Sequence, residues 1–237
     1  MIYKRLFPIL LACLSLLSFR NDVHQNEVRK PKVIYVYDAI CGWCFGFGPS
    51  MEKLNAEFAG KVDFEVVSGG LRIGDQVGSI NATAPFIKTA YKDVEKATGI
   101  MFGEKFVNGN LKSGEMILNS LPPAIAMCIF REKLPQKSMA YSKLLHEGIY
   151  VQNLEPESTA WYAEYAGKLG FDVADFNQKM KGDKYKILAE QDFSRAKSLG
   201  VTGFPAVILL KDGKYTTISN GYTDFANLKK SLEKALK

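Results

Sequence analysis

The sequence predicts an α/β fold that is interrupted by a long helical segment. Strand patterns lie only in residues 33–73 and 183–237, and the residues between them show the helical spacing of apolar side chains. A connection between neighbouring parallel strands is usually short. We therefore expect one discontinuous domain formed by the two outer segments, with residues 74–182 as an all-helical insertion.

The first outer segment predicts a strand, a helix and a second strand. The run VIYVY at 33–37 consists of β-branched and aromatic residues, which is typical of a strand buried on both faces. Apolar residues recur at helical spacing across 50–60 and stop at a glycine. Alternation in KVDFEVVSGGL (61–71) then predicts a strand that ends at two glycines.

The second outer segment predicts a helix, a hairpin and a final helix. Helical character over 184–199 leads to an apolar strand at 206–210, and the turn KDGK joins it to YTTIS at 215–219. The closing stretch, 224–237, is amphipathic. Asp224 stands at its start and lysines stand near its end, which suits the helix dipole.

Composition and charge argue against a nucleic-acid partner. The chain is 47% hydrophobic and 24% charged, and its 31 basic and 25 acidic residues give a net charge of +6. The basic residues form neither an arginine-rich block nor a stripe interleaved with aromatics. We therefore expect a solvated surface with a mild lysine excess and no nucleic-acid partner.

Residues 1–18 have the pattern of an export segment. Lys4 and Arg5 precede an apolar stretch that is too short to span a bilayer comfortably. A cleaved signal peptide, a retained membrane anchor and a lipid anchor on Cys13 of LLAC are all compatible with it. Each alternative predicts a cell-envelope location, periplasmic or membrane-anchored facing the periplasm, where disulfides are permitted. The polar residues 19–32 are then a linker.

The segment IYVYDAICGWCFGFGP carries two cysteines in CxxC spacing, between the first strand and the first helix. A redox centre needs one thiolate that attacks and one thiol that resolves. The N-terminus of a helix stabilises the thiolate through its unpaired N–H groups and its dipole. Because Cys41 lies where the helix should begin and Cys44 within its first turn, we expect Cys41 to be the nucleophile and Cys44 the resolving thiol.

Two other interpretations of the CxxC are weaker. A zinc site needs two further ligands, and the remaining soft candidates, His24, His146 and Cys128, have no paired spacing. We therefore expect no metal. A purely structural disulfide would close so short a loop that it would restrict the unfolded chain little. Cys128 is predicted to be a buried small apolar residue, and His146 a structural histidine.

Together these motifs resemble the thioredoxin fold. Pro49 lies where thioredoxin-like proteins carry the proline that kinks the active-site helix. GVTGFPAV resembles their second signature, in which a cis-proline, here Pro205, faces the cysteines. The helical block resembles the DsbA branch of bacterial disulfide oxidoreductases, and CGWCFGF with SGGL is similar to a DsbA-like group of predicted protein disulfide isomerases. The resemblance covers about 33–237 and implies a thioredoxin-like α/β fold with a large all-helical insertion.

The resemblance implies a thiol–disulfide oxidoreductase or isomerase that needs no cofactor beyond its redox-active Cys41–Cys44 pair. Its substrates would be cysteine-containing proteins, and its redox partner would be another protein or a small thiol. Trp43 would line the substrate groove, together with Phe45, Phe47 and Phe204. The backbone beside Pro205 would offer an edge to an extended substrate. The direction of electron flow stays open.

Two further functions also stay open. Glutathione-dependent isomerases and transferases share this fold, although they usually carry serine where Cys41 stands. A peptide-binding module could use the groove around Pro205 and keep a vestigial redox site. One position departs from the family: Tyr35 replaces the buried acid that assists proton transfer. Strand alternation points the nearby Asp38 elsewhere, so water or an inward-facing Glu65 would have to accept the proton of the resolving thiol.

Overall fold

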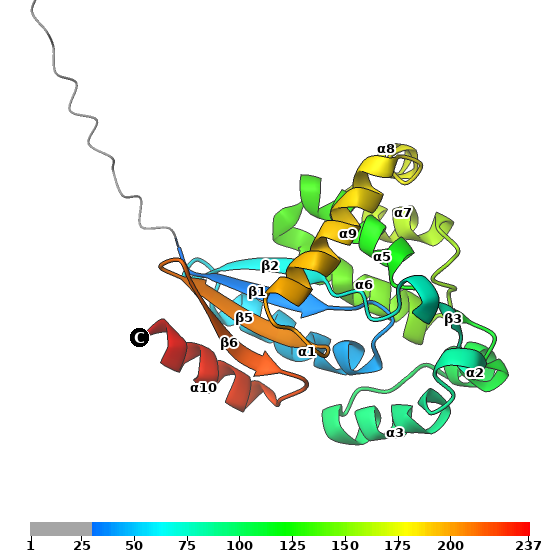
Figure 1. Cartoon of the computed structure of the whole chain (residues 1–237), viewed down its shortest axis with the longest axis horizontal. Coiled ribbons are helices and arrows are strands. Elements are labelled where there is room, and N and C mark those ends of the chain that lie inside the picture. Colours follow the sequence, from blue (N-terminus) through cyan, green and yellow to red (C-terminus); the bar gives the residue numbers. More distant parts are fainter. Residues whose placement is uncertain (1–29) are drawn as a thin grey trace, which may run out of the picture.

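A four-stranded mixed sheet forms the centre of one half of the molecule (Figure 1). The computed structural model describes residues 30–237. The strands are β1 (Lys32–Tyr37), β2 (Asp63–Ser68), β5 (Ala206–Lys211) and β6 (Lys214–Asn220). Their order is β2-β1-β5-β6, with β1 parallel to β2 and antiparallel to β5. The two outer segments of the chain therefore share one sheet, which confirms the predicted α/β fold.

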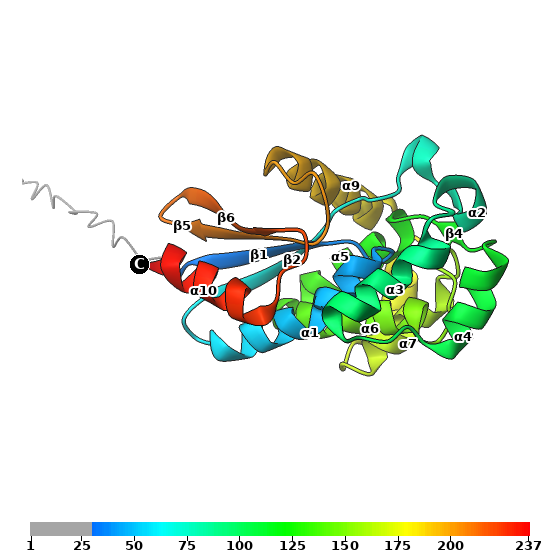
Figure 2. The same cartoon turned by 90° about the horizontal axis from the view of Figure 1, so that it is seen from below.

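Helices cover both faces of this sheet (Figure 2). Helices α1 (Gly42–Glu57) and α10 (Phe225–Leu236) lie on one face, and α9 (Asp183–Ser198) lies on the other. Strand β1 is buried on both faces because its alternate side chains meet different helices. Tyr35 and Tyr37 belong to the core that includes α1, whereas Ile34 and Val36 pack with Ala196 of α9.

The insertion between β2 and α9 is almost entirely helical, as predicted. Its helices are α2 (Ile80–Thr83), α3 (Ile87–Thr98), α4 (Glu104–Phe106), α5 (Leu121–Lys133), α6 (Ser138–Tyr150), α7 (Ala160–Gly167) and α8 (Val173–Lys179). Helical turns at 74–76, 107–111 and 135–137 complete it. The expectation of a purely helical insertion is wrong in one detail, because Gly78–Ser79 (β3) pairs antiparallel with Ile117–Leu118 (β4). A pairing of two residues is too short to leave a periodic pattern.

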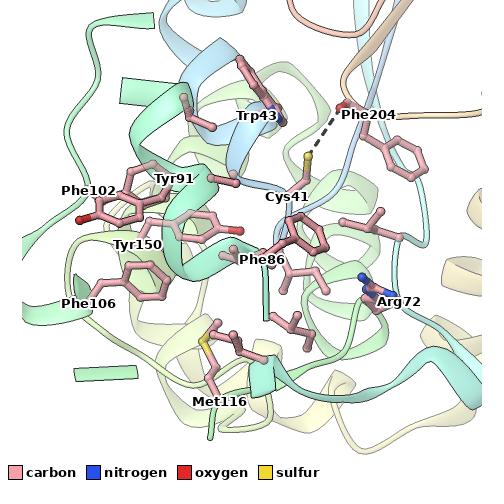
Figure 3. Close-up of a pocket in the computed structure, with 18 residues that line it drawn as sticks. Cys41, Trp43, Arg72, Phe86, Tyr91, Phe102, Phe106, Met116, Tyr150 and Phe204 are labelled. Atoms are coloured by element: carbon pink, nitrogen blue, oxygen red, sulfur yellow. Dashed lines mark hydrogen bonds between the residues drawn. The ribbon is translucent and has the colours of Figure 1, made fainter. Parts of the chain in front are cut away.

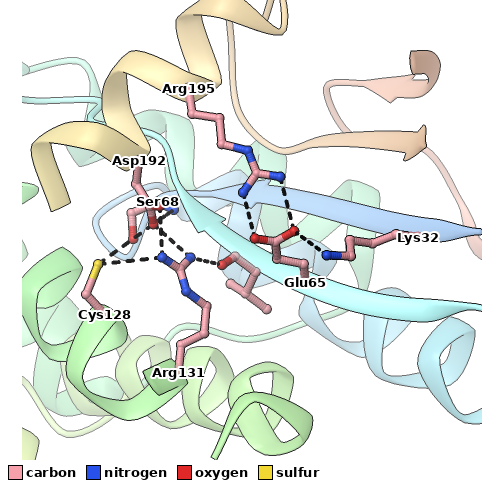
Figure 4. A network of polar contacts seen from close by, with 8 residues as sticks. Lys32, Glu65, Ser68, Cys128, Arg131, Asp192 and Arg195 are labelled. Carbon is pink, nitrogen blue, oxygen red and sulfur yellow. Dashed lines mark hydrogen bonds and ion pairs between the residues drawn. The ribbon is translucent and has the colours of Figure 1, made fainter. Parts of the chain in front are cut away.

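A buried ion pair fastens the insertion to the sheet (Figure 4). Arg131 of α5 donates two hydrogen bonds of 2.9 Å to the carboxylate of Asp192 in α9, and a third to the carbonyl oxygen of Val66 in β2. The same carboxylate accepts the backbone N–H of Ser68 at 3.1 Å. Since the pair joins α5, α9 and β2, it fixes the helices relative to the strand that runs beside β1.

Several expectations fall outside the described residues. The structure does not describe the predicted export segment 1–18, which includes Cys13. Of the predicted linker 19–32 it describes only the last three residues. Within residues 30–237, none of the helices is long and apolar enough to span a membrane.

Candidate functional site

Cys41 is the N-cap residue of α1, and Cys44 lies in the first turn of that helix. A turn follows β1, in which the backbone N–H of Cys41 donates to the carbonyl oxygen of Asp38 at 3.1 Å. The carbonyl of Cys41 in turn accepts the N–H groups of Cys44 and Phe45. This local geometry places the Cys41 sulfur beside the positive end of the helix dipole. Cys41 is 7% exposed, whereas Cys44 is completely buried.

The loop before β5 approaches Cys41 from the far end of the chain. The Phe204–Pro205 peptide bond is cis. The Cys41 thiol donates to the carbonyl oxygen of Phe204, with 3.6 Å between Sγ and oxygen (Figure 3). Antiparallel pairing of β1 with β5, which sets Val36 opposite Ala206, brings the two segments together. The structure holds the three cysteines of the described residues as free thiols.

A glycine makes room for the ring of Phe204. A Cβ atom on Gly69, at the end of β2, would lie 2.0 Å from Cε1 of Phe204. The backbone N–H of Gly69 donates to the carbonyl of Tyr37 at 2.7 Å, so the backbone cannot move away easily. Gly69, the first of the two glycines that mark the end of the second strand in the sequence, therefore also makes room for Phe204 beside Cys41.

The surroundings of Cys44 hold it as a neutral thiol. Burial raises the pKa of Cys44 well above its usual value, and the hydrogen bond and negative charge of the neighbouring Cys41 raise it further. Tyr35, which replaces the usual buried acid, donates its hydroxyl to the carbonyl of Cys44 at 3.4 Å. Burial also raises the pKa of Tyr35 well above its usual value, so Tyr35 is a neutral hydrogen-bond donor at this site.

Asp38 does not point away from the site, contrary to the strand-alternation argument. Strand β1 ends at Tyr37, so the alternation no longer governs Asp38. Its buried carboxylate accepts the N–H groups of Ile40 at 3.1 Å and Leu71 at 2.8 Å. Burial raises the pKa of this carboxyl, while the hydrogen bonds oppose the shift. Asp38 therefore braces the turn that presents the cysteines.

His146 supports the same turn from α6. Its Nε2 lies 3.1 Å from the carbonyl oxygen of Asp38, and the ring is completely buried between Tyr37, Phe45 and Tyr150. Burial lowers the pKa of His146 to about 4, so the ring is neutral at neutral pH and donates through Nε2. Nothing in the spacing of a lone histidine showed that it reaches the turn between β1 and α1.

Glu65 faces away from the cysteines. It pairs in register with Ile34, on the α9 side of the sheet, and its carboxylate binds Arg195 at 2.6 and 3.1 Å. Burial tends to raise the pKa of Glu65, but Arg195 and Lys32 outweigh it and hold that pKa below its usual value. Glu65 is therefore occupied by two cations and is not placed to accept a proton from Cys44.

The aromatic residues that follow Cys41 separate into exposed and buried sets. Trp43 is 37% exposed and lies 5.8 Å from the ring of Tyr222, measured between centroids. Phe45 and Phe47 are buried in the core, which corrects their expected place in the groove. Phe45 packs against Phe102 and Tyr150 of the insertion, whereas Phe47 packs against Tyr35 of the sheet and Tyr222. Pro49 lies inside α1 and leaves one carbonyl without its usual N–H donor.

A pocket beside Cys41 was not predicted from the sequence. It has a volume of about 240 Å³ and lies between Cys41, the loop after β2 and helix α3 of the insertion (Figure 3). We call it the α3 pocket. Its lining residues are Ile40, Cys41, Gly42, Trp43, Leu71, Arg72, Ile80, Phe86, Ile87, Ala90, Tyr91, Val94, Phe102, Phe106, Met116, Leu118, Tyr150 and Phe204. They come from four separate parts of the chain, so no local motif could reveal the pocket.

Cys128 lies away from this site, in the ion-pair cluster of Figure 4. Burial and the charge of Asp192 raise the pKa of its thiol to about 12, although Arg131 opposes the shift. Cys128 is 2% exposed and is an inert core residue. Within residues 30–237, no group of three or more histidine, cysteine, aspartate or glutamate side chains is placed to hold a metal ion.

Comparison with known proteins agrees with this geometry. The family model of the DSBA-like thioredoxin domain matches residues 32–233. A candidate protein disulfide isomerase from Nitrosomonas europaea has a similar structure, with a TM-score of 0.79 and 22% identity over 88% of this chain and 98% of that one. The cytosolic disulfide reductase DsbM from Pseudomonas aeruginosa has a TM-score of 0.71 and 22% identity over 86% and 98% of the two chains.

Among curated proteins, the chain is 22% identical over 209 residues to the ClpXP adapter protein SpxH of Halalkalibacterium halodurans. This match covers 84% of the chain but only 64% of the relative, so the chain spans less than two thirds of the length of that protein. At these levels of identity the similar structures establish the fold alone.

The expected location in the cell envelope is wrong. It rested on the export pattern of residues 1–18, which lie outside the described residues. DsbM has the same fold and is a cytosolic disulfide reductase. A reductase works where thiols are kept reduced, so the fold does not require export.

Proposed function

Because the chain belongs to the family of DSBA-like thioredoxin domains, we propose that it is a thiol–disulfide oxidoreductase with Cys41 as nucleophile and Cys44 as resolving thiol. One observation carries the proposal: Cys41 stands at the N-cap of α1, and Cys44 is completely buried one turn further on. The two cysteines therefore differ in access, as an attacking and a resolving thiol should.

The reaction follows from this asymmetry. In the reducing direction, the Cys41 thiolate attacks one sulfur of a substrate disulfide, forms a mixed disulfide and expels the other sulfur as a thiolate. Cys44 loses its proton and attacks the Cys41 sulfur. The Cys41–Cys44 disulfide forms and the substrate leaves as its second thiolate. In the oxidising direction the same steps run backwards, and the substrate dithiol becomes the disulfide.

The substrates that we propose are cysteine-containing proteins. Trp43 is partly exposed beside Cys41, and the carbonyl of Phe204 faces the reacting sulfur, so an extended segment could bind along this edge. Residues 33–73 and 183–237 would form the thioredoxin-like domain, and residues 74–182 would form the helical insertion that packs beside Cys41. A small thiol is proposed as redox partner, which the similar structure of DsbM with GSH supports (TM-score 0.68, 21% identity).

The test is a dithiol-driven insulin-reduction assay. The wild-type protein should accelerate insulin precipitation, Cys41→Ser should fall to the uncatalysed rate, and Cys128→Ser should retain full activity because Cys128 lies outside the site. Full activity of Cys41→Ser would refute the proposal. Turnover of an electrophile with glutathione but no disulfide exchange would instead favour a glutathione-dependent enzyme. Peptide binding without either activity would favour a binding module.

A redox titration against glutathione then decides the direction. A potential of the Cys41–Cys44 pair near about −120 mV would make the protein an oxidase, and one near about −270 mV a reductase.

A further inference from the structure

The α3 pocket is larger than the space that one aromatic ring needs. Its volume is about 240 Å³, whereas an apolar cavity of about 150 Å³ holds benzene. Helix α3 forms one wall with Ile87, Ala90 and Val94. Phe106 and Met116 belong to the same lining, together with many other apolar side chains. A pocket of this kind suits the compact apolar body of a small molecule.

Only one charged side chain, that of Arg72, is among the residues that line the α3 pocket. Figure 3 shows it on the wall beneath Phe204. Among residues 30–237 no carboxylate forms an ion pair with Arg72, and its guanidinium has one long hydrogen bond, 3.4 Å to the carbonyl oxygen of Thr83. A guanidinium beside apolar walls has most of its donors available to an anion and binds carboxylates in bidentate geometry.

A second polar group faces the same space. The Tyr150 hydroxyl has no hydrogen-bond partner within the described residues, although the residue is 3% exposed and lines the pocket. In Figure 3 this hydroxyl points toward Cys41 and Phe86. The pocket therefore combines apolar walls, one hydroxyl and one cation with a reactive sulfur at its edge.

We propose that the α3 pocket selects the small-thiol partner of Cys41, and that this partner has an apolar body and carries a carboxylate that pairs with Arg72. The inference rests on the proposed thiol chemistry of Cys41. The apolar body fills the space under α3, the carboxylate neutralises the guanidinium, and the sulfur of the partner meets Cys41 at the edge of the pocket.

The chemistry balances without any further reactant. When the Cys41–Cys44 pair is in its disulfide form, the thiolate of the partner attacks the Cys41 sulfur and releases Cys44, which takes up a proton. A second molecule of the thiol then attacks the partner's sulfur in the mixed disulfide and leaves as the partner's disulfide. Cys41 is the leaving group of this step and is released as its thiolate. The two electrons that reduce the protein come from the two thiols.

The experiment measures how fast Cys41 is trapped in the Cys44→Ser variant, which stops at the mixed disulfide. Its probes are the disulfides of mercaptohexanoate and mercaptohexanol, which differ only in the carboxylate, and glutathione disulfide, which lacks an apolar body. Mass spectrometry follows the adduct on Cys41. Each rate is divided by the rate of the same disulfide with N-acetylcysteine, which removes the intrinsic reactivity of the probe.

The acid should react about tenfold faster than the alcohol, which is the size of effect expected for one charge-assisted pair. This ratio should fall to about one in Arg72→Gln and recover in Arg72→Lys, which restores the charge. Ala90→Trp, which fills the pocket from α3, should slow both apolar probes about tenfold or more relative to glutathione disulfide. Thr89→Trp is the matched control, because Thr89 is the exposed neighbour on α3, and should keep the wild-type rates.

Equal rates of acid and alcohol, or a ratio unchanged by Arg72→Gln, would overturn the inference while leaving the proposed function intact. It would also be overturned if Ala90→Trp left the rates of the two apolar probes unchanged relative to that of glutathione disulfide. If no disulfide forms an adduct with Cys41, the proposed function fails and the inference falls with it.

Discussion

The thiol of Cys41 points at the backbone carbonyl oxygen of Phe204, with 3.6 Å between the two atoms. These residues stand 163 positions apart in the chain, and the antiparallel pairing of β1 with β5 brings them together. The Cys41 sulfur is thus held between the N-terminus of α1 and the backbone of the loop before β5.

Gly69→Ala should displace the ring of Phe204. The added Cβ would stand 2.0 Å from the ring, and the Gly69 backbone is held by its bond to Tyr37. We expect a loss of about tenfold in insulin reduction, because misplacing a group that lines the reacting centre is costly. Gly203→Ala is the control, since its Cβ would meet nothing within 4 Å. Equal activity of the two variants would show that insulin reduction does not depend on the position of the Phe204 ring.

Iodoacetamide should discriminate among the three cysteines within residues 30–237 of the native protein. Cys41 is partly accessible at a helix N-terminus, whereas Cys44 and Cys128 are buried, and burial raises the pKa of both thiols. At pH 7 we therefore expect one alkyl group on Cys41 before either of the others reacts. Peptide mapping after brief labelling measures this order. Early modification of Cys128 would contradict the assigned environment.

Acid should destabilise the fold partly through His146. Its pKa is about 4 in the folded protein and about 6.5 when unfolded, so the unfolded state binds more protons between these values. Stability is therefore lost as pH falls from about 6.5 to about 4, by up to about 3 kcal/mol. His146→Gln keeps a donor for Asp38 but does not titrate. Urea titrations should give it a flatter pH profile, and parallel profiles would contradict the prediction.

Removing one partner of the Arg131–Asp192 pair should be strongly destabilising. Both side chains are largely buried, and Arg131→Met would leave the Asp192 carboxylate with only the Ser68 N–H as a close donor. We expect a loss of about 3–5 kcal/mol in the free energy of unfolding. Lys133→Met, on the same helix but in an exposed ion pair, should cost less than about 1 kcal/mol. Similar losses from the two variants would show that the buried pair does not hold the fold together.

The fold was readable from the sequence because its signals are local. The β-branched run of β1, the helical spacing after CGWC and the amphipathic stretch that begins at Asp224 each predicted an element that the structure contains. The CxxC at the start of α1 was equally local. That the CxxC lies close to the TGFP loop was predicted only from the family resemblance. No local sequence pattern shows it, because it depends on the pairing of β1 with β5, which lie far apart in the chain.

The surroundings of Cys41 could not be predicted in the same way, because they depend on contacts between residues that lie far apart in the sequence. Asp38 was misplaced because strand alternation was extended one residue beyond the end of β1. No sequence pattern indicated that His146 of α6 would contact the carbonyl oxygen of Asp38, in the turn between β1 and α1. The α3 pocket, with Arg72 in its wall, forms only when the insertion folds over Cys41. The sequence could therefore single out Trp43 and Phe204 but not the apolar pocket that they border.

The central claim is that Cys41 attacks and Cys44 resolves, and trapping measures it most directly. Cys44→Ser and Cys41→Ser would each be incubated with oxidised insulin, and the products mapped by mass spectrometry under non-reducing conditions. We expect Cys44→Ser to accumulate a mixed disulfide between Cys41 and an insulin cysteine, because the resolving thiol is absent, and Cys41→Ser to form none. A stable adduct on Cys44 in Cys41→Ser, with none on Cys41 in Cys44→Ser, would contradict the account.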